Sequence, residues 1–330
     1  MKLKPDFAFC YRKQKNYASF TKRGEGMIQH VAHKKIGELF TPESQTKYHV
    51  PKYQREYIWT TENWELLFND IAEEVDNDHY LGTIITINSS ADSENPDLEI
   101  IDGQQRLTTI SLLFCAIYKR LKELNSEEDS FIANRVNLKN RILVYNSKTP
   151  RLVLSSQNNN DSDYKALLNE ISLYEMAKKP ANHGNRRIVK ANRYFQDRIS
   201  DFNIDQLQDF QNRLYNSTLV KIEVASHSDA FTLFESLNNR GVPLSAIDII
   251  KNKALSELEK IQKNSIDIAF DSWQLIIENL PDYDDQERYL RHFYNAFRYK
   301  ENVKVHGFPK AQRTGLVSVN LNQGDVPGKQ

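Results

Sequence analysis

Apolar residues recur along this chain with two periods, one typical of helices and the other typical of strands. Thr60 or Thr61 can cap a helix. Large apolar residues then follow at helical spacing, namely Trp64, Leu67, Phe68, Ile71 and Val75. The run 80–87 (YLGTIITI) predicts a strand, and 98–101 (LEII) predicts a second strand that forms a hairpin with it. A long helix is predicted over 107–124, because one apolar face continues through this stretch.

The N-terminal part carries weaker patterns. Residues 1–26 show no clear period, so we expect a flexible basic leader there, with Met27 as a candidate natural start. A short helix is predicted next from the spacing of four apolar residues, which are Ile28, Val31, Ile36 and Leu39. Residues 48–57 are predicted to be extended, because Pro51 disfavours the helical conformation of the residue before it.

The second half of the chain is mainly helical in pattern. Helices are predicted at 164–177, 187–201, 204–215, 231–237, 245–258, 265–280 and 284–299. Alternating apolar residues predict a strand at 219–224, and weaker patterns predict strands at 142–145 and 152–154.

These patterns predict an α+β fold, in which a small mixed sheet with helices is followed by a mainly helical region. We expect an α+β domain at 27–125 and a helical region at 126–310. Residues 311–330 lack any period, so we expect an irregular tail there, or a chain that is cut before its next element.

Composition narrows the class of protein. The 330 residues carry 44 basic and 44 acidic side chains, so the net charge favours no particular partner. Two cysteines are too few for a disulfide framework, which favours a reducing compartment. The most apolar run, 107–118, is shorter than the roughly 20 residues that cross a membrane, and the N-terminus has no signal-peptide pattern. We therefore expect a cytoplasmic protein without a membrane partner.

Charge is uneven along the chain. Residues 1–35 carry nine Lys or Arg and two acids, and 178–198 carry seven Lys or Arg and one acid. Residues 62–78 carry seven acids and no Lys or Arg. Basic runs are typical of surfaces that bind phosphate, so we expect DNA binding that weakens with salt. The alternative for each run is a solvated helix face.

The strand-to-helix turn Asp102-Gly103-Gln104-Gln105-Arg106 is the strongest candidate for chemistry. Anions bind readily at the start of a helix, and Gly103 lets a ligand approach closely. Arg106 can hold a phosphate with two hydrogen bonds, and Asp102 could bind a metal ion or position a water. Gln104 and Gln105 could orient a nucleophile or contact a base edge. The alternative is structural, with Asp102 capping the helix and the glutamine pair in solvent.

Two further segments carry candidate binding residues. Residues 51–59 interleave aromatic side chains with Gln and Arg, a combination suited to stacking on bases and contacting phosphate. The candidates here are Tyr53, Gln54, Arg55 and Tyr57. Residues 234–241 (FESLNNRG) and the helix after them offer Asn238, Arg240, Asp248 and Lys251. The alternatives are core packing for the first segment and helix capping for the second.

Other common catalytic patterns are missing from the sequence. It contains no GxxxxGK[ST], GxGxxG, HExxH or GxSxG pattern. Its eight histidines show neither metal-binding spacing nor the signature of a His-Asn-His nuclease centre. The chemistry is therefore expected at the three polar segments.

Taken together in order and spacing, these segments resemble the N-terminal domain of GmrSD-type restriction endonucleases. The first matching positions are Pro51, Tyr53, Gln54, Arg55, Tyr57, Trp59, Trp64, Tyr80-Leu81-Gly82 and Ile100 through Thr109. The later ones are Phe234, Glu235, Leu237, Asn238, Arg240, Gly241, Leu244, Asp248 and Lys251-Asn252. The resemblance covers about residues 28–310.

This resemblance implies a ParB/sulfiredoxin-like fold and a role in phage defence. It implies a component that hydrolyses a nucleoside triphosphate with Mg²⁺, more readily GTP, UTP or CTP than ATP, and that acts on modified DNA. Asp102 would bind Mg²⁺ or position water, Arg55 and Arg106 would clamp phosphate, and Gln104 and Gln105 would orient the nucleophile. Many members of the family continue into a His-Asn-His nuclease domain, so a separate nuclease is an expected partner. The alternative is a non-catalytic reader of nucleotide or DNA.

Overall fold

The computed structural model describes most of the chain from Met27 to Arg298. The described residues are 27–73, 79–90, 96–155, 159–238, 250–251, 254–255, 268, 270–271, 273, 275, 279–280 and 283–298. The chain divides into two compact units, Met1–Ser226 and His227–Gln330.

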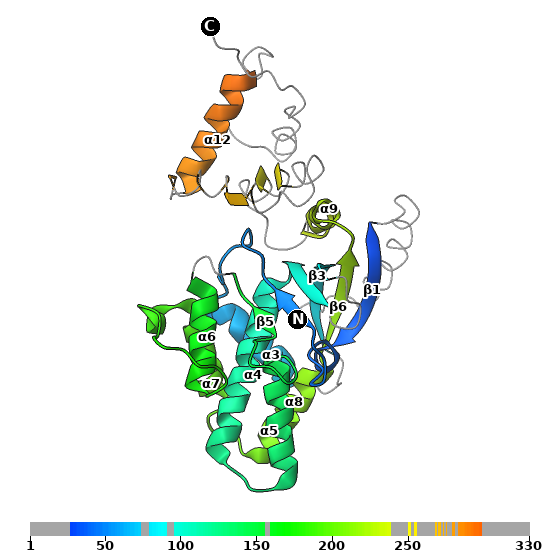
Figure 1. Ribbon diagram of the computed structural model, residues 1–330, viewed down its shortest axis with the longest axis vertical. Helices are drawn as coiled ribbons and strands as arrows, with labels where there is room; N and C mark the ends of the chain where they lie inside the picture. Colours follow the sequence, from blue (N-terminus) through cyan, green and yellow to red (C-terminus); the bar gives the residue numbers. More distant parts are fainter. Residues whose placement is uncertain are drawn as a thin grey trace, which may run out of the picture. The chain divides into compact units, whose positions relative to one another are not determined.

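The first unit contains a sheet and a set of helices (Figure 1). Its strands are β1 (Ile28–Lys35), β2 (Lys47–His49), β3 (Tyr80–Asn88), β4 (Asp97–Asp102), β5 (Leu152–Val153) and β6 (Thr218–Val224). Its helices are α2 (Ile36–Leu39), α3 (Thr61–Glu73), α4 (Gln104–Leu124), α5 (Asp129–Ile142), α6 (Asn160–Glu170), the 3-10 helix η2 (His183–Asn185), α7 (Arg187–Arg198) and α8 (Ile204–Asn216). The second unit contains α9 (His227–Asn238) and α12 (Tyr283–Arg298). The α+β fold class is confirmed.

The described strands form one mixed six-stranded sheet in the order β1-β6-β3-β4-β2-β5. β3 and β4 pair antiparallel, which confirms the predicted hairpin. β6 lies parallel to β3 and antiparallel to β1, so the sheet joins segments that are far apart in the sequence. The compact unit therefore continues past the boundary expected at residue 125, because β6 pairs directly with β3.

The helix predicted from Ile28 to Leu39 is wrong for its first eight residues. They form β1, which pairs with β6 from Ile28 opposite Val224 to Lys35 opposite Thr218. β1 lies at the edge of the described sheet, and five of its eight residues are exposed. An edge strand with so little burial lacks the strong apolar alternation that identifies a strand in a sequence.

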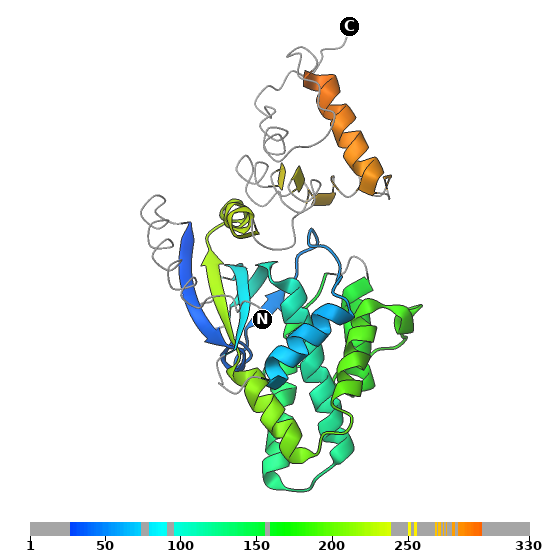
Figure 2. The ribbon, with the colours of Figure 1, turned by 180° about the vertical axis from the view of Figure 1, so that it is seen from behind.

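The apolar core surrounds helix α4 and extends from the sheet to the other helices of this unit. Most of the 21 residues of α4 are buried, which is typical of a helix surrounded by other elements. α4 packs against α5, α7 and α8, and these helices run beside it in both views (Figures 1 and 2). Strand residues such as Ile84 and Ile100 belong to the same apolar cluster as Leu107 and Leu113 of α4.

Most of the remaining sequence predictions agree with the structure. The predicted strands at 152–154 and 219–224 are confirmed. The helices predicted at 187–201, 204–215 and 284–299 are confirmed within a few residues at each end. The helix predicted at 164–177 is also confirmed, but it ends earlier, at Glu170. The weak strand at 142–145 is wrong, because α5 extends to Ile142 and Leu143 then forms only an isolated bridge with Pro150. The helices predicted at 245–258 and 265–280 lie largely outside the described residues. Within the described part of the chain, no helix has the length and apolar character to cross a membrane.

Candidate functional site

The turn between β4 and α4 is shaped by Gly103. This residue has a φ of 89°, in the left-handed region that favours glycine. A Cβ atom here would lie 2.6 Å from Cγ2 of Ile84, which is closer than real contacts allow. The helical ladder begins when the N–H of Leu107 donates to the Gly103 carbonyl at 3.0 Å. The N–H groups before Leu107 have no carbonyl partner within α4, and they make the helix start attractive to anions.

Arg106 lies against strand β3, and a second glycine makes room for it. Its Nη1 donates to the Thr83 carbonyl at 3.0 Å. Gly82 has a φ of 113°, and a Cβ atom on it would lie 2.8 Å from Cζ of Arg106. The sequence-based choice of site residues omitted Gly82 and Thr83, although a glycine inside a strand is a known signal of close approach by another group.

Asp102 and two arginines share this corner of the fold. Burial raises the pKa of the Asp102 carboxyl, while the N–H of Gly103 and the charges of Arg106 and Arg55 act to lower it. Burial also lowers the pKa of Arg106, and the nearby Asp102 and Tyr80 oppose that effect. Asp102 and Arg106 are half-buried, whereas Arg55 is exposed. The site thus combines one partly desolvated carboxylate with two cations, a balance with more positive than negative charge.

The two glutamines of the turn are buried. The alternative interpretation of the sequence, which placed both side chains in solvent, is therefore wrong. Gln104 is 7% exposed and Gln105 is 8% exposed. Nε2 of Gln104 donates to Oε1 of Gln54 at 3.1 Å and to the Arg55 carbonyl at 3.0 Å. Gln104 therefore holds the backbone of Arg55 beside the first turn of α4.

Gln105 binds the next part of the same segment. Its Oε1 accepts hydrogen bonds from the N–H of Ile58 at 2.8 Å and of Trp59 at 3.4 Å. Its Nε2 donates to the Glu56 carbonyl at 2.9 Å. Both glutamine side chains thus bind segment 51–59 to α4, which places two sequence-predicted sites side by side.

Segment 51–59 exposes fewer of its predicted binding residues than expected. The Tyr53 hydroxyl donates to Oε1 of Glu99 at 2.7 Å, and Nε2 of Gln54 donates to the Ile101 carbonyl at 2.7 Å. The Tyr57 hydroxyl is buried and hydrogen-bonds Oγ1 of Thr109 at 2.7 Å. Among the predicted binding residues of this segment, Arg55 alone is exposed.

Helix α7 contributes a residue that sequence reasoning did not place here. Nη1 of Arg187 donates to the Ile58 carbonyl at 2.7 Å. This bond connects the basic run 178–198 to segment 51–59. The charge of the run was visible in the sequence, but its contact with a segment 129 residues earlier was not.

The third predicted segment belongs to the second unit. Asn238 is the last residue of α9, and Lys251 is half-buried. Arg240 and Asp248 lie outside the described residues.

A magnesium ion fits the first site only in a limited way. The described residues contain no group of three His, Cys, Asp or Glu side chains that could hold a metal ion. Asp102 is a single carboxylate with arginines nearby. Magnesium ions are often held by one or two carboxylates together with substrate phosphates and water, and Asp102 fits that mode.

The fold and this site define an α+β domain in which Asp102, Arg106 and Arg55 gather at the turn between a strand and a buried helix. A family model described as the GmrSD restriction endonuclease, N-terminal domain, matches residues 36–255. The chain belongs to this family, which makes it a component of a restriction system and confirms the resemblance found in its motifs. A search of curated proteins found no match.

Proposed function

We propose that the chain hydrolyses a nucleoside triphosphate at the Asp102–Arg106 turn. The observation that carries this proposal is the convergence of Arg55, Arg106 and Asp102 at the start of α4. The helix start and the two arginines suit the phosphates of a nucleotide, because both favour negative charge. Arg106 is held in place by the Thr83 carbonyl, so the guanidinium needs little reorganisation when a ligand binds.

The proposed chemistry is attack of a water molecule on the γ-phosphorus, with cleavage of the bond to the diphosphate. Negative charge on the phosphoryl oxygens would be stabilised by Arg55 and Arg106. Asp102 would position the water, or would hold Mg²⁺ together with phosphate oxygens. When bound, the metal would add further neutralisation of the phosphates.

We revise the roles proposed for the two glutamines. The amides of Gln104 and Gln105 bind the backbone and side chain of segment 54–59, so we assign them to positioning Arg55 rather than to orienting the nucleophile. Removing either amide would then act through Arg55.

The test is phosphate release from GTP, UTP, CTP and ATP, with the first three expected to be the better substrates. Asp102→Asn and Arg55→Gln should each lose most of the turnover. Asp129→Asn and Arg135→Gln, both on α5, are matched controls that should retain it. Equal turnover in wild type and Asp102→Asn would rule out this site as the catalytic one.

The second candidate function is a reader that binds nucleotide without hydrolysing it. This function is favoured because both glutamine amides are hydrogen-bonded within the protein. Asp102 is then the one side chain proposed for chemistry that is not a cation. Nucleotide binding that depends on Arg55, with no phosphate release, would support this function over hydrolysis.

DNA is the proposed partner, and helix α7 is the proposed contact. Arg187, Lys190 and Arg193 are exposed on α7, which the Arg187 bond connects to segment 51–59. Other bases of the run are engaged within the protein, since Lys179 pairs with Glu170 at 2.7 Å and Arg186 lies 3.7 Å from a carboxylate oxygen of Asp163. We propose that the exposed bases bind phosphates of modified DNA and that a separate nuclease cuts it.

A further inference from the structure

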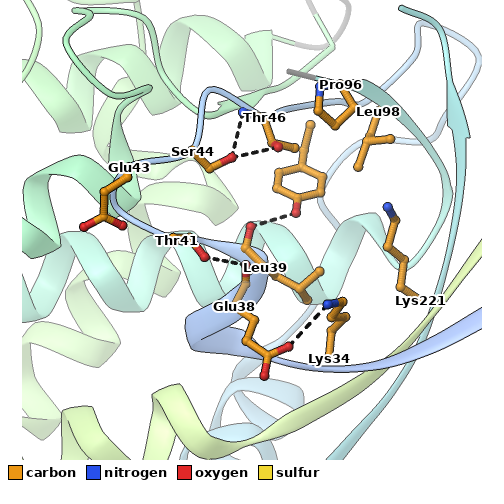
Figure 3. Close-up of a pocket in the computed structure, with 11 residues that line it drawn as sticks. Lys34, Glu38, Leu39, Thr41, Glu43, Ser44, Thr46, Pro96, Leu98 and Lys221 are labelled. Atoms are coloured by element: carbon orange, nitrogen blue, oxygen red, sulfur yellow. Dashed lines mark hydrogen bonds and ion pairs between the residues drawn. The ribbon is translucent and has the colours of Figure 1, made fainter. Parts of the chain in front are cut away.

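A hollow opens beside helix α2, away from the residues of the Asp102–Arg106 turn (Figure 3). Its volume is about 530 Å³, within the range of small-molecule sites. It lies between α2, the loop 41–46 and the sheet. Its lining residues are Lys34, Glu38, Leu39, Thr41, Glu43, Ser44, Thr46, Tyr48, Pro96, Leu98 and Lys221. None of the residues proposed for nucleotide hydrolysis is among them.

Two lysines stand on neighbouring strands at one side of this hollow. In the β1–β6 register Lys34 lies opposite Leu219 and Ala32 lies opposite Lys221, so the lysines are diagonal neighbours on one face. Diagonal neighbours have Cα atoms about 7–8 Å apart, close enough for like charges to repel. Lys221 is only 15% exposed, which is unusual for a lysine on a strand. An anion bound between the two ammonium groups would reduce the repulsion between them.

Each lysine has a carboxylate partner in the absence of ligand. Nζ of Lys34 lies 3.5 Å from Glu38 at the exposed rim, and Nζ of Lys221 lies 3.0 Å from Glu223. Exposed pairs contribute little stability, so the Lys34 pair can give way to a ligand. Figure 3 shows Glu43 on the far side of the hollow from both lysines.

A buried arginine supports the loop that forms the opposite wall. Arg151 is fully buried and donates to the carbonyls of Ser44 at 2.8 Å and Thr46 at 3.1 Å. Burial lowers its pKa to about 10, so it remains charged at neutral pH. It also donates to the backbone carbonyls of Asn140 and Leu143. Arg151 therefore fixes the loop and adds positive charge behind it.

The walls away from the lysines offer hydroxyl groups and an apolar surface. Oγ of Ser44 and Oγ1 of Thr46 lie 2.8 Å apart in the loop. Tyr48 also lines the hollow but is only 2% exposed, and its hydroxyl donates to the Leu39 carbonyl at 2.8 Å. A ligand with an anionic end and a polar body would match this arrangement.

We propose that this hollow binds a small phosphate monoester. The phosphate lies between Lys34 and Lys221, and the body of the ligand contacts the Ser44 and Thr46 hydroxyls. The site goes beyond the proposed hydrolysis and does not depend on it. A ligand there would connect β1, β6 and the loop 41–46, and would stabilise the folded state by mass action.

The test is calorimetric titration with inorganic phosphate and with GMP, with guanosine as the uncharged comparison. It is done in the Arg55→Gln background, which weakens phosphate binding at the Asp102–Arg106 turn. We expect phosphate and GMP to bind, and guanosine to bind at least about tenfold more weakly. Lys34→Gln/Lys221→Gln should lower the phosphate affinity by about tenfold or more.

Two further variants separate loss of the site from loss of the fold. Lys47→Gln removes a lysine on β2 that does not line the hollow, and it should leave the affinity unchanged. Lys34→Arg/Lys221→Arg keeps both charges and should retain phosphate binding, with a thermal midpoint that shows intact folding. The proposal is overturned if phosphate does not bind, or if the double glutamine variant binds it as tightly as the parent.

Discussion

At the scale of single residues, the two glycines at the site allow approaches that no other residue permits. Gly103→Ala should destabilise the protein by about 2 kcal/mol or more. The left-handed conformation is unfavourable for alanine, and the added Cβ clashes with Ile84. Urea unfolding measures the effect. Gly184→Ala is the matched control, since its Cβ would lie 3.4 Å from the end of the exposed Arg193 side chain and its φ is not positive. Equal stability of the two variants would contradict this explanation.

Asp102 should lower the stability of the folded protein at neutral pH, because its carboxyl is buried. Burial raises its folded pKa above the ordinary value of 3.8, so its contribution to stability is present below pH 3.8 and is lost as pH rises through the folded pKa. Asp102→Asn should therefore be at least as stable as wild type at pH 7, and this advantage should vanish below pH 3.8. Thermal midpoints across pH 3–8 test the prediction. If the variant is clearly less stable than wild type at pH 7, the favourable charges of Arg55 and Arg106 outweigh the unfavourable burial of the Asp102 carboxylate.

At the scale of elements, Gln105 connects segment 51–59 to helix α4. Gln105→Met has a similar shape but leaves the N–H of Ile58 and the Glu56 carbonyl without their partner. We expect a loss of about 1–3 kcal/mol in the free energy of unfolding and faster hydrogen exchange at the Ile58 amide. Gln208→Met, at an exposed position on α8, should change neither quantity. Unchanged exchange at Ile58 would contradict the positioning role.

The sequence predicts best those elements whose buried residues form a clear apolar pattern within one stretch of the chain. β3, β4 and α4 have apolar periods long enough to identify, and their hairpin follows from short spacing. β1 was missed because its partner β6 lies about 190 residues later and its exposed edge leaves little apolar alternation. The burial of Gln104 and Gln105 was missed for a similar reason, since the carbonyls that they bind lie about 50 residues earlier. The motif residues themselves were identifiable, whereas the division between reactive and structural side chains needed the fold.

At the scale of the whole molecule, the exposed bases of α7 should set the salt dependence of DNA binding. Each phosphate contact adds about 0.9 to the slope of log affinity against log salt. Lys190→Gln/Arg193→Gln should therefore reduce that slope by about 2, while Arg135→Gln/Lys139→Gln on α5 should leave it unchanged. Fluorescence anisotropy with labelled duplex over a salt series measures both. A slope unaffected by the α7 substitutions would place the DNA contact elsewhere.

The most direct test of the central proposal is phosphate release by the full chain with GTP and Mg²⁺, comparing wild type with Asp102→Asn. Turnover in wild type that falls by about a hundredfold or more in the variant, with folding intact, is the predicted result. Release at the same rate in both proteins would contradict the assignment of the Asp102–Arg106 turn as the catalytic site. The absence of release in wild type with any of the four nucleotides would contradict hydrolysis itself.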